Sequence, residues 1–358
     1  MKKYIIIGLL LLFIGTVVIV PMLKNDSEEG TTLPATFLFK DNLGSIWDKA
    51  DELKIQVNTD DIEKLELVYN DSVFKTWTKP KGILKYMFNA SYFGLGTKGL
   101  SLVSTLKNGQ VVNDDRLVRV LSDITPVVWI ADIAATFPHA VSSYTQGLEF
   151  NNGILYEGTG QYGESMVGQV NLNSGVVDPN KNIRLDENYF GEGITIFGDQ
   201  VYQITWKEQK CFIYDKNTMK IKQDISYVGE GWGLCNDGKS LIMSDGSERI
   251  TFRNPQTFAI ERMIEVYDDQ GPISKLNELE YIDGMIYANV WMTNKALVID
   301  PATGKVIAII DASKIEKEGR GMGDVLNGIA YNPLSKKIYF TGKNWGKLFE
   351  VKFDKPNS

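Results

Sequence analysis

After residue 140 the chain repeats one pattern of apolar and polar positions five times. Each repeat holds a short apolar run, a tight turn, and then two further short apolar runs. The apolar anchor residues of the first runs, spaced 46, 40, 45 and 50 residues apart, are Leu148, Ile194, Leu234, Leu279 and Ile329. The first four repeats add an Asp/Asn-x-x-Thr/Ser turn before a fourth run. Four short antiparallel strands repeated at this period are typical of a β-propeller, so we expect an all-β chain with a five-bladed β-propeller over residues 126–358.

The ends of the repeat region predict how this ring closes. The fifth repeat stops at Phe353-Asp354 without a fourth apolar run, and an apolar stretch before the first repeat, Val127 to Ala134, has no other place. We expect this stretch to pair as the outer strand of the fifth blade, because that pairing leaves no open sheet edge. A six-bladed ring with a degenerate blade is the alternative, although too little chain remains for a sixth blade.

Residues 34–125 follow a different pattern, in which apolar and polar residues alternate over short runs. The clearest runs are Leu53 to Val57, Leu65 to Tyr69, Gly99 to Thr105 and Arg116 to Leu121. Alternation with period two, broken by turn signals, predicts a small immunoglobulin-like or fibronectin-like β-sandwich. Nothing in this segment resembles a catalytic motif, so we expect a spacer or docking module.

The N-terminus carries an uncharged apolar run from Tyr4 to Leu23, preceded by Lys2 and Lys3. Its length matches the ~20 residues that a helix needs to span a bilayer. Lysines before the run and acids after it favour an N-terminus that stays inside. We therefore expect residues 1–33 to be a signal anchor and linker, with a cleaved signal peptide as the alternative. Both place the rest of the chain outside the cytoplasm, in the periplasm or at the cell surface.

The amino-acid composition limits the kinds of partner and metal site that the protein can have. Lys and Arg number 38 against 45 Asp and Glu, which gives a net charge of −7 and argues against a nucleic-acid partner. The sole histidine, His139, excludes His-rich zinc sites, and we expect it to have a structural role or to shape the loop at the channel mouth. Cys211 and Cys235 fit two buried small hydrophobic residues better than a disulfide between adjacent repeats.

The residue type found two positions before each anchor differs from repeat to repeat. This position is occupied by Gln146, Glu192, Trp232, Asn277 and Asn327. Because the innermost strands of a propeller line its channel, these five side chains are expected to converge at the channel mouth. A second set, 12 to 14 residues after the anchors, adds Trp206, Trp291 and Lys343. Apolar walls with a few convergent polar groups are typical of a small-ligand pocket.

Glu192 is the candidate for chemistry in this pocket. A carboxyl group between indole rings loses hydration, which raises its pKa and lets it give and take protons near neutral pH. The alternative is that Glu192 forms a salt bridge with Lys343 and only fixes two blades together. Single tryptophans also pack in ordinary cores, and Asn277 and Asn327 are of a residue type that often caps turns.

Seven ordered motifs in these repeats resemble those of the plant and bacterial glutaminyl cyclases. They are Tyr-Thr-Gln-Gly-Leu at 144–148, Phe-Gly-Glu-Gly-Ile-Thr at 190–195, Glu-Gly-Trp-Gly-Leu at 230–234, Asn-Glu-Leu-Glu-Tyr at 277–281, Ala-Asn-Val-Trp at 288–291, Asn-Gly-Ile-Ala at 327–330 and Thr-Gly-Lys-Asn-Trp at 341–345. The resemblance covers about residues 137–353 and leaves out the first 125 residues. It departs from the family at Tyr144, where the family usually has Phe, and we expect only a small effect on pocket polarity.

This resemblance implies a glutaminyl-peptide cyclotransferase, which converts the N-terminal glutamine of peptides and proteins to pyroglutamate and releases ammonia. It implies a five-bladed propeller and catalysis without zinc or another cofactor, and a structural cation elsewhere is left open. It implies Glu192 as the catalytic carboxyl group and pocket roles for Gln146, Phe190, Trp206, Trp232, Asn277, Trp291 and Lys343. Tyr144 and Asn327 complete the expected substrate-binding set. Lys343, Asn277 and Gln146 are the candidate donors to the carboxamide oxygen.

Two other hypotheses compete with this one. The first is a non-catalytic propeller that binds a peptide or glycan in the same channel mouth. The presence of an acid, Glu192, at this position disfavours that hypothesis. A metal-dependent, lactonase-type propeller would need several carboxylates converging on the channel. Among the positions two residues before the anchors there is one acid, Glu192. Asp245 is a candidate for a second acid, in the set of positions that follows the second strands.

Overall fold

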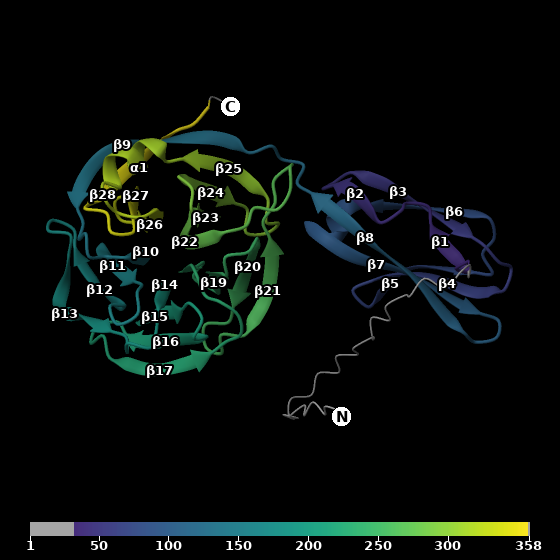
Figure 1. Ribbon diagram of the computed structural model, residues 1–358, viewed down its shortest axis with the longest axis horizontal. Coiled ribbons are helices and arrows are strands. Elements are labelled where there is room, and N and C mark those ends of the chain that lie inside the picture. The colour runs from purple at the N-terminus through teal and green to yellow at the C-terminus, as the bar shows by residue number, and fades with distance from the viewer. Residues whose placement is uncertain (1–31, 357–358) are drawn as a thin grey trace, which may run out of the picture.

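The computed structural model describes residues 32–356, which form six β-sheets and one short α-helix (Figure 1). The expected all-β class is therefore confirmed. The predicted anchor, Tyr4 to Leu23, lies outside the described residues. Within residues 32–356, no helix combines the length and apolarity that a membrane crossing requires.

Two sheets built from residues 35–121, the N-terminal sheets, enclose one apolar core. One sheet has the order β1 (Ala35–Phe37), β3 (Ala50–Val57), β6 (Ile83–Asn89). The other has the order β2 (Asn42–Ile46), β8 (Val111–Leu121), β7 (Gly96–Leu106), β4 (Ile62–Tyr69), β5 (Ser72–Thr78). A 3₁₀ helix, η1 (Ala90–Phe93), precedes β7. The strands fit the predicted alternation, since Leu53, Ile55 and Val57 of β3 and Leu65 and Leu67 of β4 are buried, and the residues between them are not.

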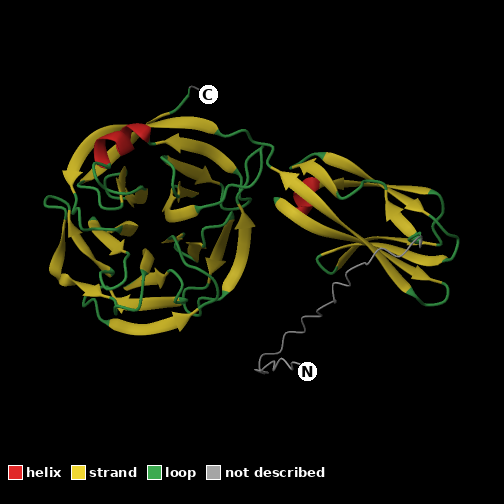
Figure 2. Ribbon diagram, in the orientation of Figure 1, coloured by secondary structure: helices red, strands yellow, loops and turns green. Residues whose placement is uncertain are grey.

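Residues 127–354 form a ring of sheets around a central axis (Figures 1 and 2). Three sheets of the ring have four strands each, paired antiparallel in sequence order. They are β10 (Thr145–Asn151), β11 (Ile154–Thr159), β12 (Met166–Asn171), β13 (Val176–Arg184); β14 (Gly191–Phe197), β15 (Gln200–Thr205), β16 (Lys210–Asp215), β17 (Ile221–Ser226); and β18 (Leu234–Asn236), β19 (Leu241–Ser244), β20 (Arg249–Arg253), β21 (Ile260–Glu265). The predicted second strands of these repeats are thus confirmed.

An eight-stranded sheet completes the ring. Its order is β22 (Leu276–Ile282), β23 (Met285–Val290), β24 (Lys295–Ile299), β25 (Val306–Asp311), β9 (Val127–Pro138), β28 (Lys347–Asp354), β27 (Lys337–Gly342), β26 (Leu326–Asn332). Strand β9 pairs antiparallel with β28, which confirms the predicted outer strand. It also pairs parallel with β25 through its first residues, so it joins two groups of strands that the sequence pattern kept separate.

The first strands of the repeats contact one another in a closed cycle, from β10 through β14, β18 and β22 to β26 and back to β10. They approach so closely that the residue before the anchor is glycine in four repeats. A Cβ on Gly233 would lie 1.9 Å from the backbone oxygen of Asn277. The fourth repeat instead has Glu278, whose carboxylate accepts the N–H groups of Leu148 (3.2 Å) and Ile329 (2.8 Å). One buried side chain of the fourth repeat therefore bonds to the first strands of both the first and the fifth repeat.

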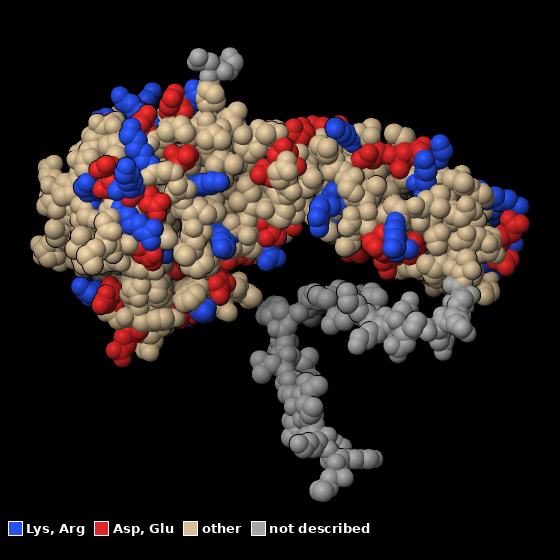
Figure 3. Space-filling view, turned by 45° about the horizontal axis from the view of Figure 1, so that its top comes forward, with Lys and Arg blue, Asp and Glu red and all other residues tan. Residues whose placement is uncertain are grey.

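Three further features bear on the predictions. Cys211 and Cys235 are both buried and free, so the interpretation as small hydrophobic residues is confirmed. Helix α1 (Ser313–Gly319) was not predicted, and it packs against β9 at the periphery of the ring (Figure 2). On the face shown in Figure 3, acidic and basic side chains are interspersed over both groups of sheets, as the near balance of charges in the sequence suggests.

Candidate active site

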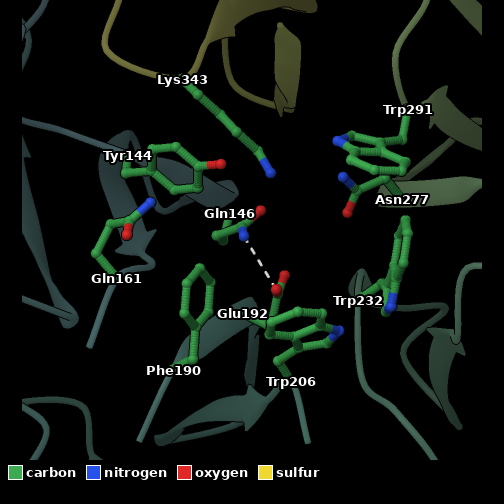
Figure 4. A pocket seen from close by; sticks show the side chains of 10 residues that line it. All are labelled: Tyr144, Gln146, Gln161, Phe190, Glu192, Trp206, Trp232, Asn277, Trp291 and Lys343. Atoms are coloured by element: carbon green, nitrogen blue, oxygen red, sulfur yellow. Dashed lines mark hydrogen bonds between the residues drawn. The ribbon is translucent and has the colours of Figure 1, made fainter. Parts of the chain in front are cut away.

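One cavity of about 220 Å³ opens at the mouth of the ring, where the first strands begin and the second strands end (Figure 4). It is lined by Tyr144, Gln146, Gln161, Phe190, Glu192, Trp206, Trp232, Asn277, Trp291 and Lys343. Nine of the ten residues predicted from the sequence are in this lining. The tenth, Asn327, is fully buried outside it.

The repeat explains why these side chains meet. Gln146, Glu192 and Asn277 stand near the starts of first strands β10, β14 and β22. Trp206 and Lys343 follow the ends of second strands β15 and β27. Because first and second strands of one sheet are antiparallel, both sets of positions lie at the same end of the ring.

Glu192 occupies the floor of the cavity and is 5% exposed. Its Oε1 accepts a hydrogen bond from Nε2 of Gln146 at 3.0 Å, and its Oε2 has no partner. Burial raises the pKa of Glu192 well above the usual value for a glutamic acid, although the positive charge of Lys343 opposes this rise. The carboxyl group therefore holds a proton more readily than an exposed glutamic acid does, and one of its oxygens has no protein partner.

Asn327 controls the orientation of Gln146. Its amide nitrogen donates to the backbone oxygen of Thr145 at 2.9 Å and to Oε1 of Gln146 at 3.1 Å. With its oxygen occupied in this way, Gln146 presents its NH₂ group to Glu192. Asn327 thus lies beneath the lining instead of contacting the cavity, because these acceptors turn its side chain away from the mouth.

Lys343 enters the cavity opposite Glu192 (Figure 4) and is 4% exposed. Its Nζ lies 4.8 Å from the ring centre of Tyr144 and has no ion-pair partner among the described residues, so the hypothesis of a Glu192–Lys343 salt bridge is wrong. Burial lowers the pKa of Lys343, whereas Glu192 and Asp324 act to raise it. Burial and the carboxylate of Asp324, which accepts the Tyr144 hydroxyl at 3.4 Å, raise the pKa of Tyr144 to about 12.

The aromatic walls are held by acidic residues at the rim. A single oxygen of Glu230, Oε2, accepts the indole N–H groups of Trp206 at 2.8 Å and of Trp232 at 3.0 Å. Trp232 meets Trp291 edge to face, with ring centres 5.5 Å apart, and Phe190 meets Trp206 at 5.6 Å. Edge-to-face contacts of this kind restrict how each ring can tilt.

His139 lies outside the cavity lining and has a structural role, as expected. It is buried, its Nδ1 lies 2.7 Å from the backbone oxygen of Trp345, and its Nε2 lies 3.0 Å from Oε1 of Glu157. Burial alone would lower the pKa of His139, but the charge and hydrogen bond of Glu157 outweigh it and raise that pKa. The imidazole therefore ties the loop before β10 to the loop before β28.

Three residues of the site were missed by the sequence analysis: Gln161, Glu230 and Asp324. The spacing of the repeats could have identified Gln161, because it lies 13 residues after Leu148 and so belongs to the set that includes Trp206 and Lys343. The third repeat has Gly246 at this position, where a Cβ would lie 2.5 Å from the ring of Trp232. Glu230 and Asp324 act through other side chains, so no spacing rule reveals them.

The lining suits a small polar ligand that is held by hydrogen bonds. Glu192 Oε2 and Asn277 Oδ1 are both buried acceptor atoms without a partner. Unpaired buried acceptors cost free energy, so their presence in a cavity points to a ligand that donates N–H groups. Asp245, the candidate for a second acidic tier, does not line the cavity and bonds to Ser247 instead. The described residues contain no group of three or more His, Cys, Asp and Glu arranged to hold a metal ion.

Comparisons with known proteins agree on one family. A family model described as glutamine cyclotransferase matches residues 102–353. A glutaminyl-peptide cyclotransferase of Arabidopsis thaliana is 37% identical over 227 residues, which cover 62% of this chain and 70% of the relative. The crystal structure of Myxococcus xanthus glutaminyl cyclase is 38% identical, with a TM-score of 0.61, and the match covers 65% of this chain and 100% of that one.

Proposed function

The chain belongs to the glutamine cyclotransferase family, and on that premise we propose that it is a glutaminyl-peptide cyclotransferase. It converts the N-terminal glutamine of a peptide to pyroglutamate and releases ammonia. The observation that carries this proposal is the buried carboxyl group of Glu192, which keeps one oxygen free on the floor of an aromatic cavity.

The unpaired acceptors suit the side chain of an N-terminal glutamine. Its carboxamide NH₂ group donates to Oδ1 of Asn277 and Oε2 of Glu192, the two oxygens of the cavity lining that are buried without a partner. The indoles of Trp206, Trp232 and Trp291 enclose the aliphatic part of the side chain. Rigid walls that hold the α-amine near the γ-carbon supply a large part of the rate, because the reaction is intramolecular.

Proton transfer is the task we assign to Glu192. The α-amine attacks the γ-carboxamide carbon, a C–N bond forms, and the bond to the side-chain nitrogen breaks. The attacking amine loses one proton and the departing nitrogen gains one, so one carboxyl group can serve both transfers. Its raised pKa brings it toward the range in which it both donates and accepts at neutral pH.

Charge develops on the carboxamide oxygen during the attack. Lys343 is our first candidate to stabilise it, since its Nζ enters the cavity opposite Glu192 without an ion-pair partner among the described residues. The amides of Asn277 and Gln146 are the other donors in the lining. A fixed donor in a dry cavity acts more strongly than one in water.

We propose that this chemistry needs no metal ion. The cavity has one carboxylate and no imidazole or thiolate, a donor set that does not make a zinc site. Chelators such as EDTA and 1,10-phenanthroline should leave turnover unchanged, and a reproducible loss that zinc restores would overturn this part of the proposal.

For the architecture, we propose that residues 126–358 form a five-bladed catalytic propeller and that residues 34–125 form an immunoglobulin-like sandwich. The closed cycle of first strands β10, β14, β18, β22 and β26 supports five blades. We further propose that Tyr4 to Leu23 anchor the chain in a membrane, with the enzyme outside the cytoplasm. Protease treatment of intact cells or spheroplasts should digest the enzyme without lysis, and full protection until lysis would refute this location.

The test of the function is direct. The purified protein, incubated with a peptide that begins with glutamine, should produce a peptide lighter by one ammonia and blocked to Edman degradation. Turnover of the matched peptide that begins with asparagine should be absent or far slower. Binding of glutamine-initiated peptides without any mass change would instead support a non-catalytic peptide-binding protein.

A further inference from the structure

A peptide substrate cannot fit into the cavity beyond its first residue. The cavity volume is about 220 Å³, below the roughly 300–1,000 Å³ typical of drug-sized ligands. If the N-terminal glutamine fills it, the second and third residues of the peptide must lie on the surface beside the mouth. What they meet there sets which peptides are good substrates.

A second concave site of about 620 Å³ lies on segments that precede β10, β26 and β28, at the same end of the ring. It is formed by Val141, by residues 318–323 at the end of α1 and after it, and by Asn344, Gly346 and Lys347 between β27 and the start of β28. We call it the rim groove, and its lining is Val141, Glu318, Gly319, Arg320, Gly321, Met322, Gly323, Asn344, Gly346 and Lys347.

The rim groove continues the walls of the catalytic cavity. Asn344 of the groove directly follows Lys343 of the cavity, and Val141 lies three residues before Tyr144. Hydrogen bonds lock these loops together: Asn344 donates from its backbone N–H to the oxygen of Ser143 at 2.7 Å and from Nδ2 to the oxygen of Val141 at 2.9 Å. Tyr144 and Lys343 are in contact, so a peptide that leaves the mouth on their side passes over them and meets Val141 and Asn344 of the groove.

The chemistry of the groove favours an apolar side chain. Val141 is 69% exposed and Met322 is fully exposed, and both line the same depression. Its basic residues are already engaged, since Arg320 pairs with Glu316 at 3.0 Å and Lys347 donates to the backbone oxygen of Glu318 at 2.9 Å. We propose that the rim groove binds the second and third residues of the peptide substrate and selects an apolar side chain there. This inference rests on the proposed function.

A different depression on the other side of the 140–144 loop is the competing exit. Its lining includes Ala140, Ser143, Glu164, Val176 and Arg184. It offers one exposed apolar residue, Val176, and it borders the cavity through the 140–144 loop, the end of β11 and the following loop, which carries Gln161 and Glu164. The rim groove is favoured because it adds the pair of exposed apolar side chains and adjoins Lys343.

The experiment compares kcat/KM for Gln-Ala amide with that for Gln-Leu-Ala amide, Gln-Ala-Leu amide and Gln-Ala-Ala amide. At least one leucine peptide should exceed the alanine peptide by about fourfold for each methylene that it buries. Val141→Thr and Met322→Gln keep side-chain size and make the groove more polar. Each should lower the ratio of kcat/KM for the leucine peptide to kcat/KM for the alanine peptide toward one. Their matched controls, Val176→Thr in the competing depression and Met263→Gln on outer strand β21, should keep it.

The outcomes separate this inference from the function beneath it. No turnover of any of the four substrates would refute the cyclotransferase proposal itself. Turnover with equal kcat/KM for leucine and alanine peptides would overturn the rim groove alone. The leucine preference could instead be lost in Val176→Thr and kept in Val141→Thr and Met322→Gln. That result would show that the peptide binds in the competing depression, and it would also refute the proposal for the rim groove. Thermal unfolding of each variant shows whether its fold is intact.

Discussion

The two groups of sheets bury different kinds of side chain. The N-terminal sheets close on an apolar core, and Asp114 is the single buried charged residue described there. The ring is made of strands of similar length, yet its buried charged or titratable side chains include His139, Glu149, Glu157, Glu192, Arg253, Glu278, Glu280, Lys305, Lys343 and Glu350. An ordinary sheet core can be built without such groups, so the ring has them for other reasons.

The buried acids of the ring divide into two kinds. Glu278 and Glu280 accept backbone N–H groups from other repeats, and Glu149 accepts from Thr195 at 2.6 Å and from the backbone of Ile196 at 3.1 Å. These residues connect the repeats across gaps that backbone pairing leaves open. Glu192 differs, because one of its oxygens has no partner. Because this unpaired oxygen belongs to a residue of the cavity lining, a bound ligand can supply the missing partner.

The largest effect should come from replacing this unpaired acid. Glu192→Gln keeps the size of the side chain and removes its ability to transfer protons, so kcat should fall by about 10²–10⁴-fold. The thermal unfolding midpoint should stay near the wild-type value, because the pairing with Gln146 can be kept by an amide. Mass spectrometry of a glutamine-initiated peptide measures the loss, and a kcat within threefold of wild type would remove Glu192 from its role.

The matched control is the buried acid of the other region. Asp114 accepts the backbone N–H of Phe37 at 2.8 Å and pairs with Arg116 at 3.0 Å. Asp114→Asn should lower the free energy of unfolding by about 1–3 kcal/mol and leave kcat unchanged. If Asp114→Asn reduced kcat as strongly as Glu192→Gln, the contrast between structural and catalytic acids would fail.

The second largest effect concerns pH and stability. Burial raises the pKa of Glu149 from its usual 4.5 to about 7. Between these values the folded state binds a proton that the unfolded state has lost, so the free energy of unfolding falls as pH rises through this window. The fall from this one group is about 3 kcal/mol, because each pKa unit corresponds to about 1.4 kcal/mol.

Glu149→Gln tests this assignment. It should reduce the pH dependence between pH 5 and pH 8, because an amide can still accept from Thr195 and carries no charge at any pH. The buried carboxyl groups of Glu278 and Glu280, whose pKa values burial also raises, keep part of the dependence. Urea unfolding at the two pH values measures the difference. An unchanged slope in the variant would mean that Glu149 is not the titrating group.

The contrast also explains what the sequence could predict. The anchors and the residues two positions before them repeat with the strands, so the ring and seven of the cavity residues follow from spacing, whereas Tyr144 and Phe190 were expected only from the family resemblance. Asn327 obeys the same spacing but turns beneath the lining, because acceptors on Thr145 and Gln146 capture its amide. Position in a repeat fixes where a backbone lies, whereas the final direction of a polar side chain depends on its partners.

Other features left no periodic signal. Glu230 bonds to Trp206 from 24 residues away, a relation that depends on how one repeat packs on the next. Helix α1 has seven residues and no side-chain cap at its N-terminus, so neither length nor capping predicted it. Strand β9 was placed beside β28 by the argument of a closed edge, but its pairing with β25 was missed, because one strand was assumed to serve one sheet group.

Glu230 offers a smaller effect that separates positioning from chemistry. Glu230→Ala removes the shared acceptor of Trp206 and Trp232, so both indoles can tilt and kcat/KM should fall on the order of tenfold. Glu230→Gln keeps an acceptor oxygen and should restore most of this loss. The pH profile of kcat should keep its shape in both variants, because neither removes a proton-transfer group. A wild-type kcat/KM for Glu230→Ala would show that the aromatic contacts alone hold the walls.

The smallest expected effect lies at the joint between the two regions. Lys98 of β7 pairs with Glu265 of β21, and both side chains are less than one-fifth exposed. Lys98→Met should lower the free energy of unfolding by about 1 kcal/mol, whereas Lys54→Met, which breaks the exposed pair with Glu52, should have no measurable effect. Neither change should alter kcat, since neither lysine lines the cavity. Calorimetry measures the unfolding of each variant. Equal changes in unfolding free energy for Lys98→Met and Lys54→Met would mean that the joint adds nothing to stability. Two separate unfolding transitions in the wild type would mean that the apolar core and the polar ring fold as independent units.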